Sequence, residues 1–273
     1  MFVVLKIQKT DKRAVRRGRT IHDVRLINTG AGQCFYEVTA LAGENGVNWE
    51  EVAAITGNHG RQLLLSDDVL LPEACPVARF DSSGFRNLLI FNTAELILKE
   101  LFFMGDRVRC IVNDPDGLYS EHIRKIVRFA AHTTVVTENE FRYFSAVRDI
   151  YADMGAGVTL TDNISNISPE ALCIDTSGTL NSENTIIFSP FRGISPFRAD
   201  CRGGLDRFCP PYINPIDFLG AMLKLNKKTA LSQALCRSFL LDGKPFTPYE
   251  LARLIKDGEN ADVAHSKSII FYV

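Results

Sequence analysis

The sequence predicts an α/β fold in which a central parallel sheet with flanking helices follows an N-terminal mixed α+β region and precedes a C-terminal helical segment. Three observations support this. From residue 106, short β-branched segments alternate with amphipathic ones at intervals of about 25 residues, as in right-handed crossover units. The 273 residues are 46% hydrophobic and 23% charged, which excludes disorder and suits one large domain or two modest ones. After Ser189, prolines and glycines indicate an irregular connection.

Charge and cysteine content limit the classes of partner. The 31 Lys and Arg residues balance 32 Asp and Glu residues, so the net charge of −1 gives no general attraction for nucleic acid or an anionic membrane. No apolar run approaches the ~20 residues of a membrane span, and the start lacks a secretory pattern. Seven cysteines, an odd number, favour free thiols over a disulfide framework. We therefore expect a cytoplasmic protein that binds neither nucleic acid nor membrane, with homo-oligomerisation left open.

The first region, residues 1–105, mixes strands and helices. Short β-branched and aromatic segments predict strands at 1–7, 23–27 and 35–41. Gly30 and Gly32 begin a glycine pattern typical of dinucleotide loops, but its third glycine is absent, so we expect a hairpin turn there. Helices are predicted over 49–56 and over about 85–104, each followed by a glycine.

The second region, residues 106–192, is the regular one, and it predicts a Rossmann-like unit. Strands are expected at 107–112, 133–137, 158–161, 171–174 and 185–188, with helices at 119–131 and 140–154. The third region, residues 193–273, holds the Pro/Gly-rich connection. Helices are expected over 215–225, over 229–240 and from Thr247, where Thr-Pro-Tyr-Glu fits a capping box, followed by a terminal strand at 268–273.

Polar side chains follow the strands of the Rossmann-like unit at the points where the strands end. Because the carboxyl ends of parallel strands share one edge, where such sheets bind ligands, we expect these residues to surround a common hollow. The same residue types also form ordinary turns. The candidate ligand-binding residues are Asn113, Gly117, Thr137, Asn139, Asp162, Asp175, Thr176, Ser177 and Gly178.

Asp114 and Asp116 are the candidate catalytic residues, because two segments resemble a known motif. Residues 110–118 (CIVNDPDGL) and 172–180 (LCIDTSGTL) resemble the first motif of haloacid-dehalogenase-like phosphotransferases. The resemblance implies Asp114 as a nucleophile, Asp116 as an acid/base and Thr137 as a phosphate ligand. It also implies Mg²⁺ as cofactor, with Asp162 helping to bind the metal. A carboxylate nucleophile needs such a cation to neutralise phosphate charge.

The sequence leaves several functions open. The first is a Rossmann-like protein that binds a small anionic or nucleotide-like ligand at the carboxyl edge of the sheet, with or without catalysis. The others are an NAD(P)-type oxidoreductase that lacks the glycine fingerprint, a Mg²⁺-dependent phosphohydrolase, and a non-catalytic scaffold or regulatory protein. In the oxidoreductase, Asp114 or Asp116 would accept a hydrogen bond from a ribose hydroxyl. No specific metal-binding residue is predicted from spacing, and the cofactor stays unknown between NAD(P) and Mg²⁺.

Overall fold

The chain forms two compact units in the computed structural model. The first comprises Met1–Ser82 and Cys201–Thr229, and the second comprises Ser83–Asp200 and Ala230–Val273. The segment 83–105 thus groups with the second unit, whereas the sequence prediction placed it with the N-terminal region. The structure describes residues 2–10, 20–28, 34–43, 46–58, 62–66, 68–163, 171–180, 186–189, 209–214, 217–218, 220–222, 239–241, 244–246 and 270–272.

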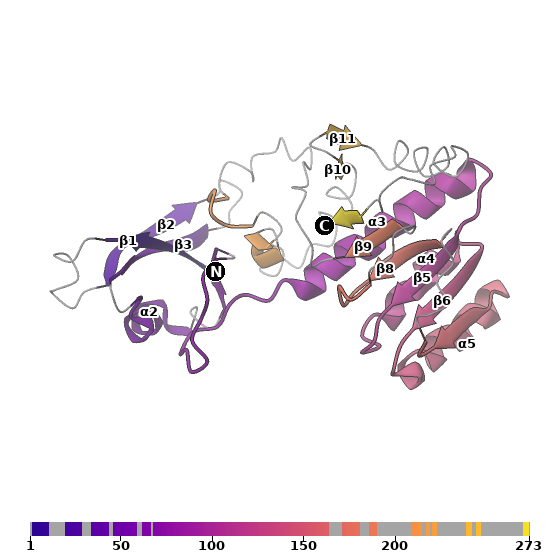
Figure 1. Ribbon diagram of the computed structural model, residues 1–273, viewed down its shortest axis with the longest axis horizontal. Helices are drawn as coiled ribbons and strands as arrows, with labels where there is room; N and C mark the ends of the chain where they lie inside the picture. The colour runs from indigo at the N-terminus through magenta and orange to yellow at the C-terminus, as the bar shows by residue number, and fades with distance from the viewer. Residues whose placement is uncertain are drawn as a thin grey trace. The chain divides into compact units, whose positions relative to one another are not determined.

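The first unit is built on a four-stranded mixed sheet (Figure 1). Its strands, in the order β2-β3-β1-β4, are β1 (Val3–Lys9), β2 (Ile21–Asn28), β3 (Cys34–Ala42) and β4 (Leu63–Leu64). β1 runs parallel to β3 and β4, and β2 runs antiparallel to β3. The antiparallel pairing of β2 with β3 agrees with the expected hairpin, although its turn, residues 29–33, lies outside the described residues.

At the start of β1 both faces of the sheet are buried, because this strand is apolar at consecutive positions. Val3 and Leu5 pack on one face with Val52 of the helix α2 (Trp49–Thr56). Phe2 and Val4 pack on the other face, where Phe218 belongs to the same cluster. Side chains alternate between the faces of a strand, so this run fills two layers of core. The α2 helix has the predicted bounds, with the side chain of Asn48 accepting a hydrogen bond from the Glu51 amide at its start.

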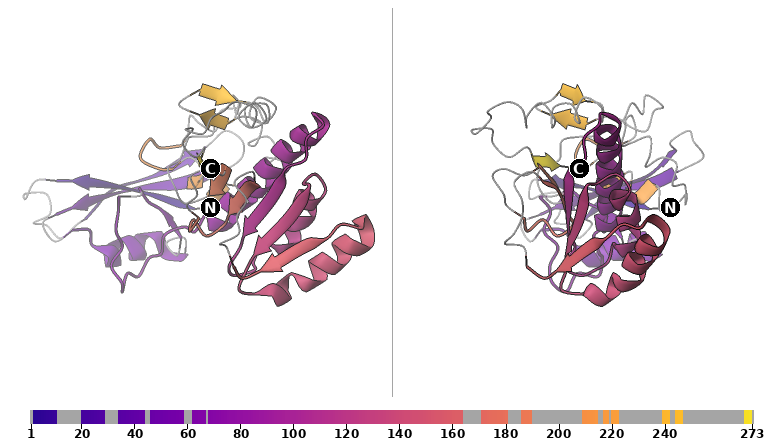
Figure 2. Two further views of the ribbon diagram at one scale, coloured as in Figure 1. Left: turned by 45° about the vertical axis from the view of Figure 1, so that its right-hand side comes forward. Right: turned by 90° about the vertical axis from the view of Figure 1, so that its right-hand side faces the viewer.

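The second unit contains a six-stranded sheet in which every neighbouring pair is parallel (Figure 2). The strands are β5 (Arg109–Asn113), β6 (His132–Val136), β7 (Val158–Thr161), β8 (Ala171–Asp175), β9 (Ile186–Ser189) and β12 (Ile270–Tyr272). Their order is β12-β9-β8-β5-β6-β7. The chain therefore builds outward from β5 in one direction, returns to β8 on the other side of β5, and continues outward from there.

This order is that of the doubly wound Rossmann fold, and it confirms the predicted fold class. The direction of winding reverses between β5 and β8, and the crevice at such a reversal, outside the carboxyl ends of the strands, is where open α/β sheets bind ligands. β5 is buried from Cys110 to Asn113, as expected for a central strand covered on both faces. We call the carboxyl ends of β5 and β8, with the loops that follow them, the switch point.

Within the described residues, three α-helices lie along the sheet of the second unit. They are α3 (Ser83–Phe103), α4 (Ile123–Val127) and α5 (Phe144–Met154). α3 packs against β8, β9 and α4, α4 packs against β6 and α5, and the helices thus form one layer (Figure 1). Two predicted helices were too long: residues 120–122 and 140–142 form 3₁₀ turns before α4 and α5, and α4 ends at Val127 rather than at Ala131. The helix α4 ends early because the amide of Ala131 donates to the carbonyl of Val108, which begins β6 beside β5.

The C-terminal third differs from the expected run of helices. Residues 217–218 and 220–222 are helical, within the helix expected over 215–225. The helix expected over 229–240 is wrong at its end, because Phe239–Leu241 forms strand β10, antiparallel to β11 (Lys244–Phe246). Phe239 and Leu240 are residues that fit a strand as readily as a helix. The helix expected from Thr247 lies outside the described residues, whereas strand β12 confirms the terminal strand.

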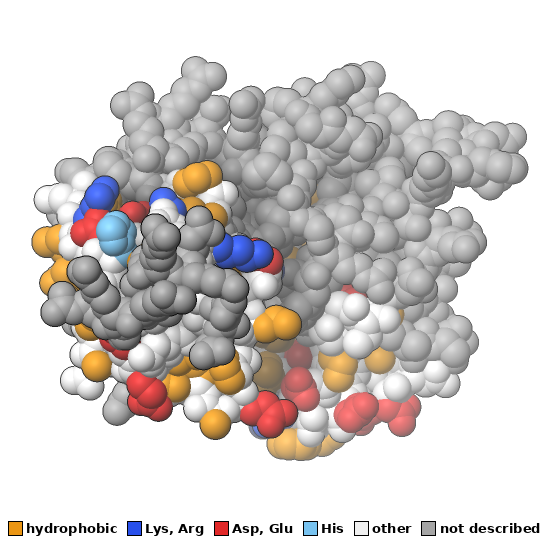
Figure 3. All heavy atoms as spheres, turned by 60° about the vertical axis from the view of Figure 1, so that its left-hand side comes forward, with side chains coloured by type: hydrophobic (Ala, Val, Ile, Leu, Met, Phe, Trp, Pro, Cys, Tyr) orange, Lys and Arg blue, Asp and Glu red, His pale blue; other side chains and the backbone are white. Residues whose placement is uncertain are grey.

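Two expectations from the sequence, on the cysteines and on membrane-spanning helices, can be compared with the described part of the chain. The five cysteines in it, Cys34, Cys75, Cys110, Cys173 and Cys209, are all free thiols. None of the helices within the described residues has the length and apolarity needed to cross a bilayer. On the face shown in Figure 3, the described basic side chains stand in isolated patches among acidic and hydrophobic ones.

Candidate functional site

The switch point is held together by hydrogen bonds between the ends of β5 and β8. Asn113 and Asp175 are register partners on the two strands, and both are buried. The Asn113 side-chain amide lies 2.9 Å from Oδ1 of Asp175, to which it donates. The same nitrogen lies 3.0 Å from Oγ of Ser177 and 3.1 Å from Oγ1 of Thr179. The amide of Asn113, the carboxylate of Asp175 and the two hydroxyl groups therefore form one hydrogen-bonded network between the strand ends.

The loop after β8 is ordered around the carboxylate of Asp175. Oδ1 accepts from the amide and the hydroxyl of Ser177, at 3.2 and 2.9 Å, and Oδ2 accepts from the amide of Leu180 at 2.8 Å. Gly178, at φ 71°, provides the left-handed residue that this tight loop needs. Thr176 donates through both its amide and its hydroxyl to the carbonyl of Asn113. The loop is thus fixed to the end of β5 by hydrogen bonds within the protein.

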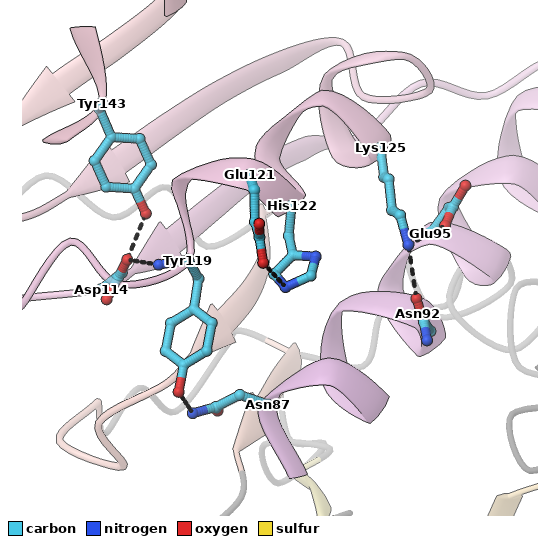
Figure 4. Close-up of polar contacts among 9 residues, drawn as sticks. All are labelled: Asn87, Asn92, Glu95, Asp114, Tyr119, Glu121, His122, Lys125 and Tyr143. Carbon is cyan, nitrogen blue, oxygen red and sulfur yellow. Dashed lines mark hydrogen bonds and ion pairs between the residues drawn. The ribbon is translucent and has the colours of Figure 1, made fainter. Parts of the chain in front are cut away.

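The loop after β5 is ordered around a second buried carboxylate, that of Asp114 (Figure 4). Oδ2 of Asp114 accepts from the hydroxyl of Tyr143 at 2.6 Å and from the amide of Tyr119 at 2.9 Å. Burial, and then the charge of Asp114, raise the pKa of Tyr143 far above its usual value, so Tyr143 stays protonated and donates. Tyr119 immediately precedes the 3₁₀ turn that leads into α4. In a dinucleotide loop, a bound phosphate would accept a hydrogen bond from the amide at this position. Here the carboxylate of Asp114 accepts from that amide instead.

The loops after β5 and β6 are in direct contact. The carbonyl of Pro115 accepts from the amide of Glu138, the hydroxyl of Thr137 and the side-chain amide of Asn139. Gly117 is buried at φ 65°, and a Cβ atom on it would lie 3.1 Å from Cδ of Arg142 and 3.2 Å from Cβ of Asn139. Glycine is favoured here for two reasons: the backbone conformation is left-handed, and a Cβ atom would force the side chains of Arg142 and Asn139 to move by a few tenths of an ångström.

Three of the four predicted loops therefore come together, and the fourth lies beside them. Asp162, after β7, is exposed, and β7 is two strand spacings, roughly 10 Å, from β5. Its loop is connected to the β6 loop through the Thr137 amide, which donates to the carbonyl of Thr161. Of the predicted residues, those buried and already hydrogen-bonded within the protein are Asn113, Asp114, Gly117, Thr137, Asp175 and Thr176.

The residues that reach solvent at this edge carry mainly negative charge. Asp116, Glu138 and Asp162 are exposed, and Arg142 is the exposed base among them. Ser177, Gly178 and Asn139 are partly exposed. Carboxylates accept hydrogen bonds from hydroxyl, amide and amine groups, whereas their negative charge repels phosphates and other carboxylates placed nearby. We call these exposed side chains the rim; their chemistry suits groups that donate hydrogen bonds.

Several residues of this edge were not selected from the sequence. Tyr119 and Tyr143 were missed because they lie next to the helical segments, six residues after the end of β5 and seven residues after the end of β6. Asn87 of α3 donates to the hydroxyl of Tyr119 at 2.6 Å, which links α3 to the β5 loop (Figure 4). Thr179 was the residue that a sequence pattern could have indicated, since it follows Ser177 in the same polar loop.

The side chain of His122 packs between α4 and α3, beside Tyr119 of the β5 loop, with the two ring centroids 6.2 Å apart. Its ring stacks on Phe91 at a centroid distance of 5.1 Å, and its Nε2 is 3.4 Å from a carboxylate oxygen of Glu121 (Figure 4). Burial lowers the pKa of His122, and this effect exceeds the opposing one of Glu121. The neighbouring Lys125 donates to Asn92 at 3.0 Å. These contacts join the helices, in agreement with a structural role for His122.

The thiols beneath the switch point are unreactive by their environment. Burial, and then Asp175, raise the pKa of Cys173 to about 12, and burial raises the pKa of Cys110 well above its usual value. A nucleophilic cysteine needs a lowered pKa. Within the described residues no group of three or more His, Cys, Asp and Glu side chains is arranged to hold a metal ion.

Comparisons with known proteins give a fold-level similarity and no family. No protein-family description and no curated protein sequence matches this chain. Among solved structures, the L-tryptophan dehydrogenase from Nostoc punctiforme is similar with a TM-score of 0.39 and 10% sequence identity, covering 95% of this chain and 82% of that one. Similarity at this level does not transfer an activity. The Rossmann-like assignment rests on the strand order of the second unit itself.

Proposed function

We propose that the second unit binds a small nucleotide-like molecule at the switch point, chiefly through the hydroxyl and amino groups of its nucleoside part. The observation that carries this proposal is the strand order, which puts the reversal of winding between β5 and β8. The loops that end these two strands are hydrogen-bonded to each other, and the hydroxyls of Ser177 and Thr179 belong to the same network, 2.8 Å apart. Preorganised polar groups of this kind orient small ligands.

The charges at the edge narrow the class of ligand. Asp116 and Glu138 at the rim would accept hydrogen bonds from ribose hydroxyl or amino groups. A pyrophosphate would gain little in the β5 loop, because Asp114 already accepts from the Tyr119 amide there. The proposed ligand is therefore still nucleotide-like, but the groups of the ligand that contact the protein here are neutral or cationic rather than anionic.

Asp114 serves in this proposal as a positioning residue rather than a nucleophile. Its side chain is 1% exposed, and Oδ2 is occupied by two protein donors. Thr137, which the phosphotransferase motif would assign to phosphate, donates instead to the carbonyl of Pro115. The contacts of these two residues favour binding over phosphoryl transfer at this edge.

Calorimetric titration of the full chain with adenosine and with NAD⁺ tests the proposal. Adenosine should bind saturably, and Asp116→Asn should weaken its binding by about tenfold, the usual value for a hydrogen bond to a charged group. Asp149→Asn is the matched control, because Asp149 is exposed on α5 and pairs with Arg148. NAD⁺ should bind no more tightly than adenosine. Absence of saturable adenosine binding would refute the proposal, and NAD⁺ binding tighter by about a hundredfold would favour the oxidoreductase alternative.

A further inference from the structure

The opposite edge of the same sheet carries a basic depression of about 650 Å³. Its lining includes Arg107 before β5, His132 and Thr133 at the start of β6, and Arg124 and Arg128 near the end of α4. These residues lie at the amino ends of the parallel strands, away from the switch point. The volume falls within the range of roughly 300–1,000 Å³ that is typical of small-molecule sites.

The charge of the depression is strongly positive. Three guanidinium groups line it against the single carboxylate of Asp153, which pairs with Arg124 at 2.9 Å. Within the described residues, no carboxylate forms an ion pair with Arg107 or Arg128. Arginines near a helix end also interact with its terminal carbonyl groups. Arg107 follows the end of α3 by four residues and Arg128 is the first residue after α4, so this interaction is open to both side chains.

Two of the arginines are held by an aromatic pair. The guanidinium of Arg107 lies 4.7 Å from the centroid of the Phe102 ring, and that of Arg128 lies 5.5 Å from the centroid of Phe129. Phe102 and Phe129 contact each other edge to face at 5.9 Å. Stacking uses the face of a guanidinium and leaves its N–H groups at the edge free to bind an anion.

The depression also contains unused hydrogen-bonding capacity. Thr133 is 1% exposed, and its hydroxyl has no hydrogen-bond partner among the described residues. Buried polar groups are normally satisfied, so an unpaired hydroxyl in the lining of a concave site calls for a ligand or water. His132 contributes its ring nearby, with Nε2 3.0 Å from Oγ1 of Thr159.

We propose that this depression binds a small phosphate-bearing molecule. Planar guanidinium groups match the geometry of phosphate oxygens and form paired, charge-assisted hydrogen bonds with them. The aromatic pair orders Arg107 and Arg128 in advance, which reduces the entropy lost on binding. The site is independent of the proposed nucleoside site, because the two lie at opposite ends of the strands and carry opposite charge.

Inorganic pyrophosphate is a suitable probe, titrated calorimetrically into the full chain at a constant ionic strength of about 0.15 M. Wild-type protein should bind it saturably. The double variant Arg107→Gln/Arg128→Gln should lose at least about tenfold in affinity, the effect of removing charge-assisted hydrogen bonds. Arg148→Gln, which removes an exposed arginine of α5 outside the depression, should bind as wild type does.

Two outcomes would overturn the proposal: no saturable binding by the wild type, or equal affinity in wild type and double variant. An equal loss in Arg148→Gln would also overturn it, because the effect would then be one of general charge. Should the double variant fail to fold, amide hydrogen exchange of the wild type decides. Pyrophosphate should slow exchange in residues 130–133 and 154–157, and protection confined to other segments would contradict the assignment.

Discussion

Replacement of Tyr143 by phenylalanine tests the buried hydrogen bond that orders the β5 loop. The tyrosine is fully buried and its hydroxyl donates to Asp114 at 2.6 Å. Tyr143→Phe keeps the ring and therefore creates no large cavity, but it leaves Oδ2 of a buried carboxylate with one fewer donor.

The expected cost follows from the charge and the burial of Asp114. Hydrogen bonds to charged groups contribute about 1.5–3 kcal/mol to the free energy of unfolding. For a domain of this size, each kcal/mol lowers the melting temperature by roughly 2–4 °C, so a decrease of about 3–12 °C is expected. Since the pKa of Tyr143 is raised, the bond persists throughout the neutral and mildly alkaline range.

Urea denaturation followed by circular dichroism measures this change, with Tyr151→Phe as the matched control. Tyr151 lies on α5, the helix that Tyr143 immediately precedes, and is 69% exposed, so its hydroxyl should contribute less than about 0.5 kcal/mol. A double-mutant cycle with Asp114→Asn should give a coupling energy of about 1 kcal/mol or more between the two side chains. Equal midpoints for Tyr143→Phe and Tyr151→Phe would refute the assigned role of Asp114.

Three further predictions concern the loops and the helix layer. Gly117→Ala should destabilise the protein by about 1–2 kcal/mol more than Gly155→Ala, because both glycines have a φ near 65° but only Gly117 has neighbours within 4 Å; equal losses in urea denaturation would contradict the close approach. Asn113→Ala should cost about 1–3 kcal/mol and speed amide exchange in residues 176–180, since it removes the donor that joins β5 to the β8 loop; unchanged exchange there would contradict this. The pKa of His122 is lowered in the folded protein, so the unfolded chain binds a proton on this residue more tightly. The free energy of unfolding should therefore fall as the pH drops through about 6.5, and His122→Phe should reduce this dependence on pH. An identical slope in both proteins between pH 7.5 and 5.5 would show that another group is responsible.

The strands of the second unit were predictable because buried parallel strands leave a strong local signal. Cys110–Val112 and Leu172–Ile174 are short apolar runs bounded by polar turn formers, and α5 ends at a glycine in the left-handed conformation. The order in which the strands pair could not be predicted from the sequence. That β8 lies beside β5 rather than beyond β7 depends on contacts between residues more than 60 positions apart, which no local pattern records.

The chemistry of the candidate site was predictable by residue type but not by role. The polar residues after the strands do lie at one edge, as parallel geometry requires. Their burial depends on partners that are distant in sequence: Asp114 is covered by Tyr143, and Asn113 is bonded to Asp175. The catalytic role that the motif predicts for Asp114 and Asp116 stays a prediction, and the fold adds a structural role for the buried carboxylates of Asp114 and Asp175, which accept hydrogen bonds that order their loops.

The central claim, that the switch point between β5 and β8 is the ligand site, is tested most directly by nuclear magnetic resonance of the full chain titrated with adenosine. The account predicts saturable changes in backbone amide shifts within residues 113–119, 137–139 and 176–180, with little change in unit one or at the amino edge of the sheet. Shifts that cluster elsewhere, or no change at saturating adenosine, would contradict it.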